Sequence, residues 1–196
     1  MSVETRAPSR LIRAAALTGA LTLLLAACGD EDDGASAAPP DTTAPDTAAA
    51  PDTLEVVAVD FEFENLPERV PAGTQLTFVN NAPTELHELV AVLLPEDEDR
   101  SVDELVGLPP EEMGRSLFAV EPVTVLMAAP GGEQIAAVGD GTLSEPGRYA
   151  ILCVIPTGVE PEVYFAAAAE TEEGPPQVEG GPPHIAHGMY AELIVE

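Results

Sequence analysis

The clearest pattern along the chain is an alternation of apolar and polar residues that begins after residue 54. Val57, Val59, Phe61 and Phe63 alternate with smaller or acidic residues, and this period of two predicts a half-buried strand over 57–64. Gly, Pro and Asn turns separate the apolar runs that follow. These runs predict further strands over 76–79, 87–94, 120–128, 134–138, 149–155 and 190–195.

Two stretches interrupt the strands. Residues 96–118 predict a helical insertion, because Ser101 can cap a helix that starts at Val102 and Pro110 suits the first turn of a second short helix. Residues 156–183 are rich in Pro, Gly and Glu and predict a long loop. Short strands separated by Gly and Pro turns favour an antiparallel β-sandwich, and we predict a single domain over 54–196.

The residues before this domain are typical of an export signal. Three Arg among the first thirteen residues precede an apolar run over 14–25, which ends in Leu-Ala-Ala before Cys28. We therefore predict a signal peptide over 1–27. The cleavage region resembles a bacterial lipobox, and this resemblance implies that Cys28 becomes the lipidated first residue of the mature protein. The alternative is an uncleaved membrane anchor, although a spanning helix needs roughly 20 apolar residues.

Residues 28–53 predict a disordered tether. The segment repeats Ala, Pro, Thr and Asp and contains no aromatic or large aliphatic side chain, so it cannot bury enough surface to fold. The mature domain is then extracytoplasmic, on the cell surface or the periplasmic side, and is anchored to the cell membrane by lipid. If Cys28 carries lipid, Cys153 has no disulfide partner in its own chain.

The charge of the chain excludes several classes of partner. Seven Arg, no Lys and 35 acidic residues give a formal net charge of −28. Nucleic acids and anionic lipid headgroups both require basic side chains, so neither is an expected partner. The acidic residues form either a solvated surface or a surface that steers a basic partner.

Four residues stand out as candidate metal ligands, namely His87, Cys153, His184 and Met189. Two imidazoles and a thiolate in a trigonal plane, with a weak axial thioether, form a blue-copper electron-transfer site. The alternatives are ordinary core positions for Cys153, His87 and Met189. His187 is a second histidine near Met189, and we interpret it as a loop residue and His184 as the ligand.

The sequence around these four residues resembles the cupredoxin family. The similar segments are Phe78-Val79-Asn80-Asn81 before His87, the run from Pro146-Gly147 through Tyr149 to Cys153, and His184 followed by Gly188-Met189. The resemblance implies a Greek-key antiparallel β-sandwich that holds one type 1 copper ion. The chain differs from the family in its long segment between Cys153 and His184. It also has Glu88 where the family usually has Asn.

We expect electron transfer rather than catalysis, because four protein ligands leave no open position for a substrate. The expected partner is a redox protein of unknown identity, and we expect a monomer. Two alternatives use the same domain. One is copper storage or delivery at the cell envelope, and the other is a metal-free cupredoxin-like binding module.

Overall fold

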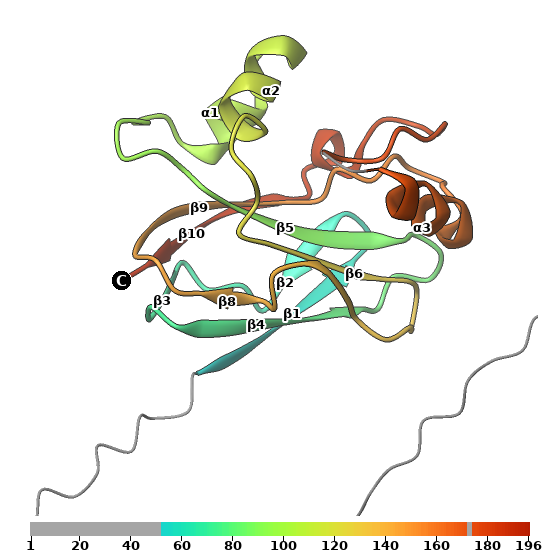
Figure 1. Cartoon of the computed structure of the whole chain (residues 1–196), viewed down its shortest axis with the longest axis horizontal. Coiled ribbons are helices and arrows are strands. Elements are labelled where there is room, and N and C mark those ends of the chain that lie inside the picture. The colour runs from blue at the N-terminus through green and yellow to red at the C-terminus, as the bar shows by residue number, and fades with distance from the viewer. Residues whose placement is uncertain (1–51, 172–173) are drawn as a thin grey trace, which may run out of the picture. The chain divides into compact units, whose positions relative to one another are not determined.

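The computed structural model describes residues 52–171 and 174–196, which form the β-rich domain drawn in Figure 1. The predicted signal peptide, the predicted lipidation site Cys28 and nearly all of the predicted tether lie outside the described residues. The first strand begins at Thr53, one residue before the predicted start of the domain. In the described part of the chain, no helix is long and apolar enough to cross a membrane.

The domain is a sandwich of two β-sheets, which lie one above the other in Figure 1. The four-stranded sheet has the order β2-β1-β4-β8, and the six-stranded sheet has the order β3-β10-β9-β5-β6-β7. The smaller sheet contains β1 (Thr53–Val59), β2 (Glu62–Glu64), β4 (Thr74–Asn80) and β8 (Thr142–Leu143). The larger sheet contains β3 (Arg69–Val70), β5 (His87–Leu93), β6 (Thr124–Ala128), β7 (Ile135–Val138), β9 (Gly147–Leu152) and β10 (Tyr190–Val195).

The sandwich is confirmed, but its sheets are mixed rather than purely antiparallel. β1 pairs with β4 in parallel, and β3 pairs with β10 in parallel, whereas the other pairings are antiparallel. A parallel pair needs a crossover connection. Between β1 and β4 the chain provides it by visiting β3 in the opposite sheet. The alternation of apolar and polar residues cannot reveal the parallel pairs, because it is the same in parallel and antiparallel strands.

The single strand predicted over 57–64 is wrong. The chain turns at Asp60 and Phe61, and Val59 pairs with Glu62 across a two-residue hairpin between β1 and β2. Phe61 has a φ of 70°, which is uncommon for a residue other than glycine. The apolar and polar residues alternate through this turn without a Gly, Asn or Pro to mark it.

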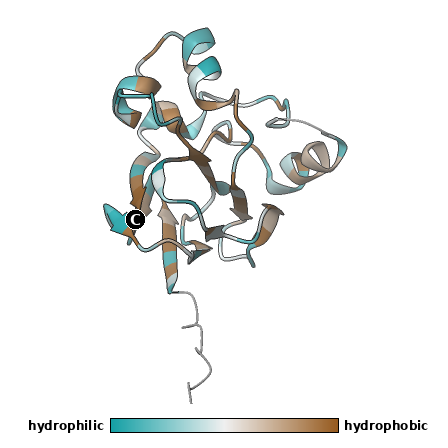
Figure 2. Ribbon diagram, turned by 60° about the vertical axis from the view of Figure 1, so that its left-hand side comes forward, coloured by the Kyte–Doolittle hydropathy of each residue, from teal (hydrophilic) through white to brown (hydrophobic). Residues whose placement is uncertain are grey.

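Strand β5 of the six-stranded sheet is covered on both faces. Six of the seven residues of β5 are buried, from His87 to Val92. One face contacts the main core between the sheets, which includes Leu89 and Ala91. The other contributes Val90 and Val92 to a second cluster beneath the helical insertion. The most hydrophobic segments in Figure 2 lie on strands inside the sandwich.

The helical insertion is confirmed, and a further helix lies where the sequence predicted only a loop. Ser101 caps the first helix, and its side chain and that of Glu104 form a reciprocal capping box. The predicted loop over 156–183 contains a ten-residue helix, so that prediction is wrong for its central part. The helices are α1 (Val102–Val106), α2 (Pro110–Leu117), α3 (Pro161–Glu170) and one 3-10 turn, η1 (His184–His187).

Candidate metal centre

Backbone hydrogen bonds place Cys153 beside the segment that carries His184 and Met189. Cys153 is the first residue after β9, and its N–H donates to the carbonyl of Met189 at 3.1 Å. Its own carbonyl accepts from the N–H of Ile185 at 2.8 Å. The N–H of His184 donates to the carbonyl of Ile155 at 3.0 Å. Three predicted ligands are therefore fixed by main-chain bonds and not only by side-chain packing.

The long segment between Cys153 and His184 is closed at its base. Pro156 and Pro183 form an isolated antiparallel bridge. The N–H of Thr157 donates to the carbonyl of Pro182 at 3.1 Å, and the N–H of Gly181 donates to the carbonyl of Thr157 at 2.9 Å. The two ends of this segment therefore lie side by side next to the site. This closure explains why Cys153 and His184 lie close together although a long segment separates them in the sequence.

Asn80 positions the loop that leads to His87. It is the last residue of β4 and is fully buried. Its amide nitrogen donates to the carbonyls of Glu85 and Ala128, both at 2.8 Å, and its side-chain oxygen accepts from the N–H of Ala82 at 2.9 Å. These bonds connect the loop to β6, and His87 pairs with Ala128 across the neighbouring strands. The side chain of Asn80 therefore holds both ends of this loop.

The donor atoms of His87, Cys153 and His184 form a compact triangle. The two Nδ1 atoms lie 3.0 Å apart, and the Cys153 sulfur lies 3.3 Å from Nδ1 of His184 and 3.8 Å from Nδ1 of His87. A trigonal ion with bonds of about 2.0 Å to nitrogen and about 2.3 Å to sulfur would separate such donors by about 3.5 to 3.7 Å. The observed triangle therefore matches trigonal coordination within about half an ångström.

The donor types and this spacing fit one type 1 copper ion.

Burial keeps the histidines of the copper site neutral. All three donor side chains are fully buried. Desolvation, followed by the neighbouring His184, lowers the pKa of His87 to about 4, and desolvation also lowers the pKa of His184. Neutral imidazole is the form that binds a metal. Desolvation, reinforced by the nearby Glu88, raises the pKa of the Cys153 thiol, so this sulfur becomes a thiolate only when a cation replaces its proton.

Met189, the predicted axial ligand, lies next to these donors along the backbone. It is fully buried in the main core, as is Cys153, and its N–H donates to the carbonyl of His184 at 3.1 Å. Its role as a ligand stays a prediction. His187 is exposed, is the last residue of the 3-10 turn η1 rather than part of a loop, and does not belong to the group of donors.

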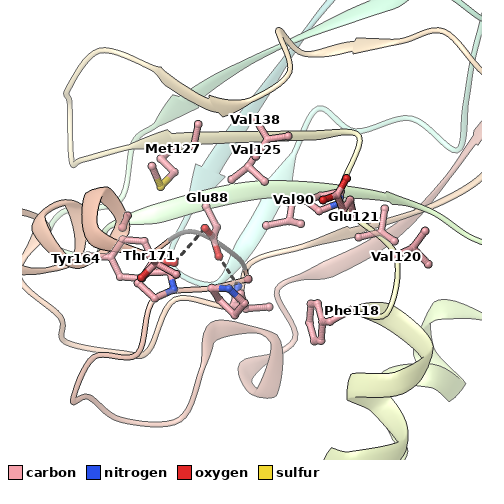
Figure 3. Close-up of a pocket in the computed structure, with 18 of the residues that line it drawn as sticks. Glu88, Val90, Phe118, Val120, Glu121, Val125, Met127, Val138, Tyr164 and Thr171 are labelled. Carbon is pink, nitrogen blue, oxygen red and sulfur yellow. Dashed lines mark hydrogen bonds between the residues drawn. The ribbon is translucent and has the colours of Figure 1, made fainter.

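Glu88 supports the cysteine side of the copper site. Its backbone N–H donates to the Cys153 sulfur at 3.4 Å. Its carboxylate accepts from the N–H of Val154 and from the hydroxyl of Tyr164, both at 3.2 Å, as the dashed lines in Figure 3 show. Desolvation raises the pKa of this buried carboxyl to about 7. Glu88 therefore acts as an acceptor that ties β5 to the segment after Cys153 and to α3.

Glu85 faces the outer nitrogen of His184. Its Oε2 lies 3.4 Å from Nε2 of His184, a buried nitrogen that makes no hydrogen bond in the structure. The same oxygen accepts from the N–H of Gly158 at 2.9 Å. If Nδ1 binds a metal, the imidazole proton lies on Nε2 and points to this carboxylate, which is the usual arrangement around ligating histidines. No sequence pattern points to Glu85, because its role depends on tertiary contact.

A cavity of about 660 Å³ lies beside Glu88 on the outer face of the larger sheet. In Figure 3 its wall includes Val90, Val125 and Val138 from the strands, Phe118 from the end of α2, and Tyr164 from α3. The cavity contacts the residues that support the copper site, but the ligand triangle does not line it.

The solved structures that are similar to this chain include three auracyanins. The chain is 25% identical to a dithionite-reduced auracyanin from Roseiflexus castenholzii, with a TM-score of 0.40 over 75% of this chain and 98% of that one. It is 17% identical to auracyanin B, with a TM-score of 0.38 and coverages of 74% and 88%. It is 18% identical to auracyanin A, described as a blue copper protein from Chloroflexus aurantiacus, with a TM-score of 0.39 and coverages of 74% and 99%.

TM-scores of this size add no weight to the copper assignment, which rests on the donor atoms. No protein-family model and no curated protein sequence matches the chain.

Proposed function

We propose that this protein is an electron-transfer protein that carries one type 1 copper ion and works outside the cytoplasm. The observation that supports the proposal most strongly is the buried triangle of two imidazole nitrogens and one thiol sulfur, with edges of 3.0 to 3.8 Å. A copper ion bound there would supply reversible one-electron chemistry.

The residues of the chain would bind the ion and keep its surroundings fixed. His87 and His184 would each provide Nδ1, Cys153 would provide its thiolate, and Met189 would provide a weak axial sulfur. The main-chain bonds around Cys153 hold Cys153, His184 and Met189 in place in the metal-free chain, and the pairing of β5 with β6 holds His87. The N–H of Glu88 would stabilise negative charge on the Cys153 sulfur. Such a preformed site changes little between two charge states.

The burial of the donors argues against an enzyme. His87, Cys153 and His184 have no exposed surface, so a substrate has no direct route to an ion between them. Electrons need no such route, because they can pass through the side chains that cover a site. We therefore propose a carrier that exchanges electrons with a partner protein. The large negative charge of the chain suits a partner with a basic surface.

Voltammetry of the copper-loaded protein tests this function. We expect a reversible one-electron couple in the parent protein and in His187→Ala, because His187 is exposed and outside the triangle. His184→Ala should abolish the couple, because it removes a donor from the triangle. A parent protein that binds copper but shows no reversible couple, and that gives the ion quickly to a chelator, would favour copper storage or delivery.

We further propose that Cys28 carries a lipid that tethers the domain to the cell membrane. The proposal rests on Leu-Ala-Ala before Cys28 and on the low-complexity segment after it. Cys28→Ala should move the protein from the membrane fraction to the soluble fraction, and Cys153→Ala serves as the matched control. Membrane association that survives Cys28→Ala would show that the chain is held by another segment.

A further inference from the structure

An aromatic side chain from the smaller sheet lies against the histidines of the copper site. Phe61 is the second residue of the β1–β2 turn and is half-buried. Its ring centroid lies 4.9 Å from that of His184 in an edge-on arrangement and 4.7 Å from that of His187 in a stacked arrangement. It also approaches His87 edge-on at 6.4 Å. Phe61 therefore contacts all three histidines of the chain.

The backbone conformation at Phe61 is unfavourable for phenylalanine, although its ring packs against the histidines. A φ of 70° at the second position of a two-residue turn favours glycine or asparagine, which carry little steric penalty there. Asn65, the other non-glycine residue with positive φ in the described chain, has the expected type. A residue held in an unfavourable backbone conformation often belongs to a functional site. At Phe61 the side chain, rather than the turn, accounts for the residue type.

We infer that Phe61 is a positioning and shielding residue of the copper site. With His187 it forms an aromatic cover, a pair of stacked rings that separates the imidazole of His184 from solvent. His184 is fully buried although His187, three residues later, is exposed. The edge-on contact also fixes the orientation of the His184 ring, whose Nδ1 belongs to the donor triangle. This inference adds a residue to the proposed copper function and rests on it.

The shielding is tested first on the metal-free full-length protein with diethyl pyrocarbonate, which modifies accessible neutral imidazoles. Peptide mapping reports each of the three histidines, and a histidine-containing peptide added to every sample is the reference for the reagent. Phe61→Ala should raise the modification rate of His184 by about tenfold or more, because burial no longer protects the ring. Phe61→Tyr keeps an aromatic ring at this position and should retain the protection.

Phe63 provides a matched control on the same hairpin. It is also half-buried, but its ring packs edge-on against Phe78 with centroids 6.4 Å apart. Phe63→Ala should leave the modification rate of His184 unchanged while removing a ring of the same size. Phe61→Leu is the second variant, because its smaller loss of volume keeps the folded state if Phe61→Ala unfolds. Thermal unfolding of each variant confirms which of them are folded.

The copper-loaded protein tests the positioning role. Phe61→Ala should shift the reduction potential and accelerate copper removal by a chelator by about tenfold or more, since water then reaches the His184 edge. Phe61→Tyr and Phe63→Ala should behave like the parent in both measurements.

The outcomes separate this inference from the proposed function. Unchanged His184 reactivity in folded Phe61→Ala and Phe61→Leu would overturn the aromatic cover, even if copper binds. Increased reactivity in a protein whose parent binds no copper would support the shielding and refute the copper function. Equal effects of Phe61→Ala and Phe63→Ala would show a general loosening of the hairpin and would also overturn the inference.

Discussion

Two excursions leave the six-stranded sheet, and they contribute to the protein in different ways. The segment with α1 and α2 buries Val102, Leu105 and Leu117 in the second hydrophobic cluster. The segment after Cys153 contains α3, which buries only Tyr164. The hydroxyl of Tyr164 reaches Glu88 beside the copper site. In Figure 1 the first segment lies above one part of the larger sheet and α3 lies at one end of the domain.

The first excursion therefore mainly affects the stability of the domain, and the second mainly affects the geometry of the copper site. The first excursion contributes apolar area and two backbone carbonyls that accept hydrogen bonds from Arg148 of β9, and it donates none of the candidate ligands. In the second excursion α3 buries only Tyr164, Ile155 and Val159 before it belong to the main core, and the segment begins and ends at the candidate ligands Cys153 and His184. Changes in the first should lower the free energy of unfolding and leave the site intact. Changes in α3 should affect the copper site more than they affect overall stability, because its one buried side chain donates to Glu88.

Leu105→Ala should have the largest effect on stability. Leu105 is fully buried in α1, and truncation of such a leucine lowers the free energy of unfolding by about 2 to 5 kcal/mol through lost burial and a cavity. Chemical denaturation of the metal-free protein measures this loss. Val163→Ala, on an exposed position of α3, is the control and should change stability by about 0.5 kcal/mol or less. If folded Leu105→Ala has an altered copper spectrum, the first excursion also affects the copper site, which would contradict this account.

Arg148→Lys should have the next largest effect. Arg148, on β9, donates to the carbonyls of Glu98 and Arg100 before α1 and to both carboxylate oxygens of Glu192. These hydrogen bonds also hold the pKa of Glu192 below its usual range. Lysine cannot reproduce this planar set of donors, so we expect a loss of about 1 to 2 kcal/mol in partly exposed surroundings.

Chemical denaturation measures the loss from Arg148→Lys, and Arg115→Lys on α2 is its control. Arg115 donates to the carbonyl of Glu111 within its own helix, so its replacement should have little effect on stability. Equal losses from the two variants would show that the connection between β9 and the first excursion does not matter.

Tyr164→Phe should have the smallest effect on stability and a clear effect on the copper site. It removes the hydrogen bond to Glu88 while keeping the ring buried, which costs about 0.5 to 1.5 kcal/mol. Because Glu88 also accepts from Val154 and donates its N–H to Cys153, the absorption maximum and the reduction potential of the copper protein should shift. Phe165→Leu, at the neighbouring half-buried position, should leave both unchanged. A shift of equal size in that control would show that Tyr164 has no specific role at the copper site.

The sequence predicted the first excursion better than the second, for a physical reason. The helix start at Ser101 is marked by a capping box, which acts within four residues and can be recognised without knowledge of tertiary structure. Helix α3 has Pro161 at its first turn and a run of alanines over 166–169, and both favour a helix. The Pro, Gly and Glu around it obscured this signal in the composition of the whole segment.

The donors of the copper site could be predicted because copper needs rare residue types, and the chain contains few of them. Three histidines and two cysteines leave little choice of ligands. Asn80, Glu85 and Phe61 could not be assigned in the same way, because common residue types acquire these roles only through tertiary contacts. The strand predicted across Phe61 also hid the turn that brings its ring to the histidines.

The visible absorption spectrum of the copper-loaded protein tests the central claim most directly. The parent should show an intense charge-transfer band from the bond between copper and the Cys153 thiolate. Cys153→Ser should abolish the band, because a serine hydroxyl is not ionised at neutral pH and cannot replace the thiolate. A parent protein that binds one copper ion without this band, or a band that survives Cys153→Ser, would contradict the type 1 copper site.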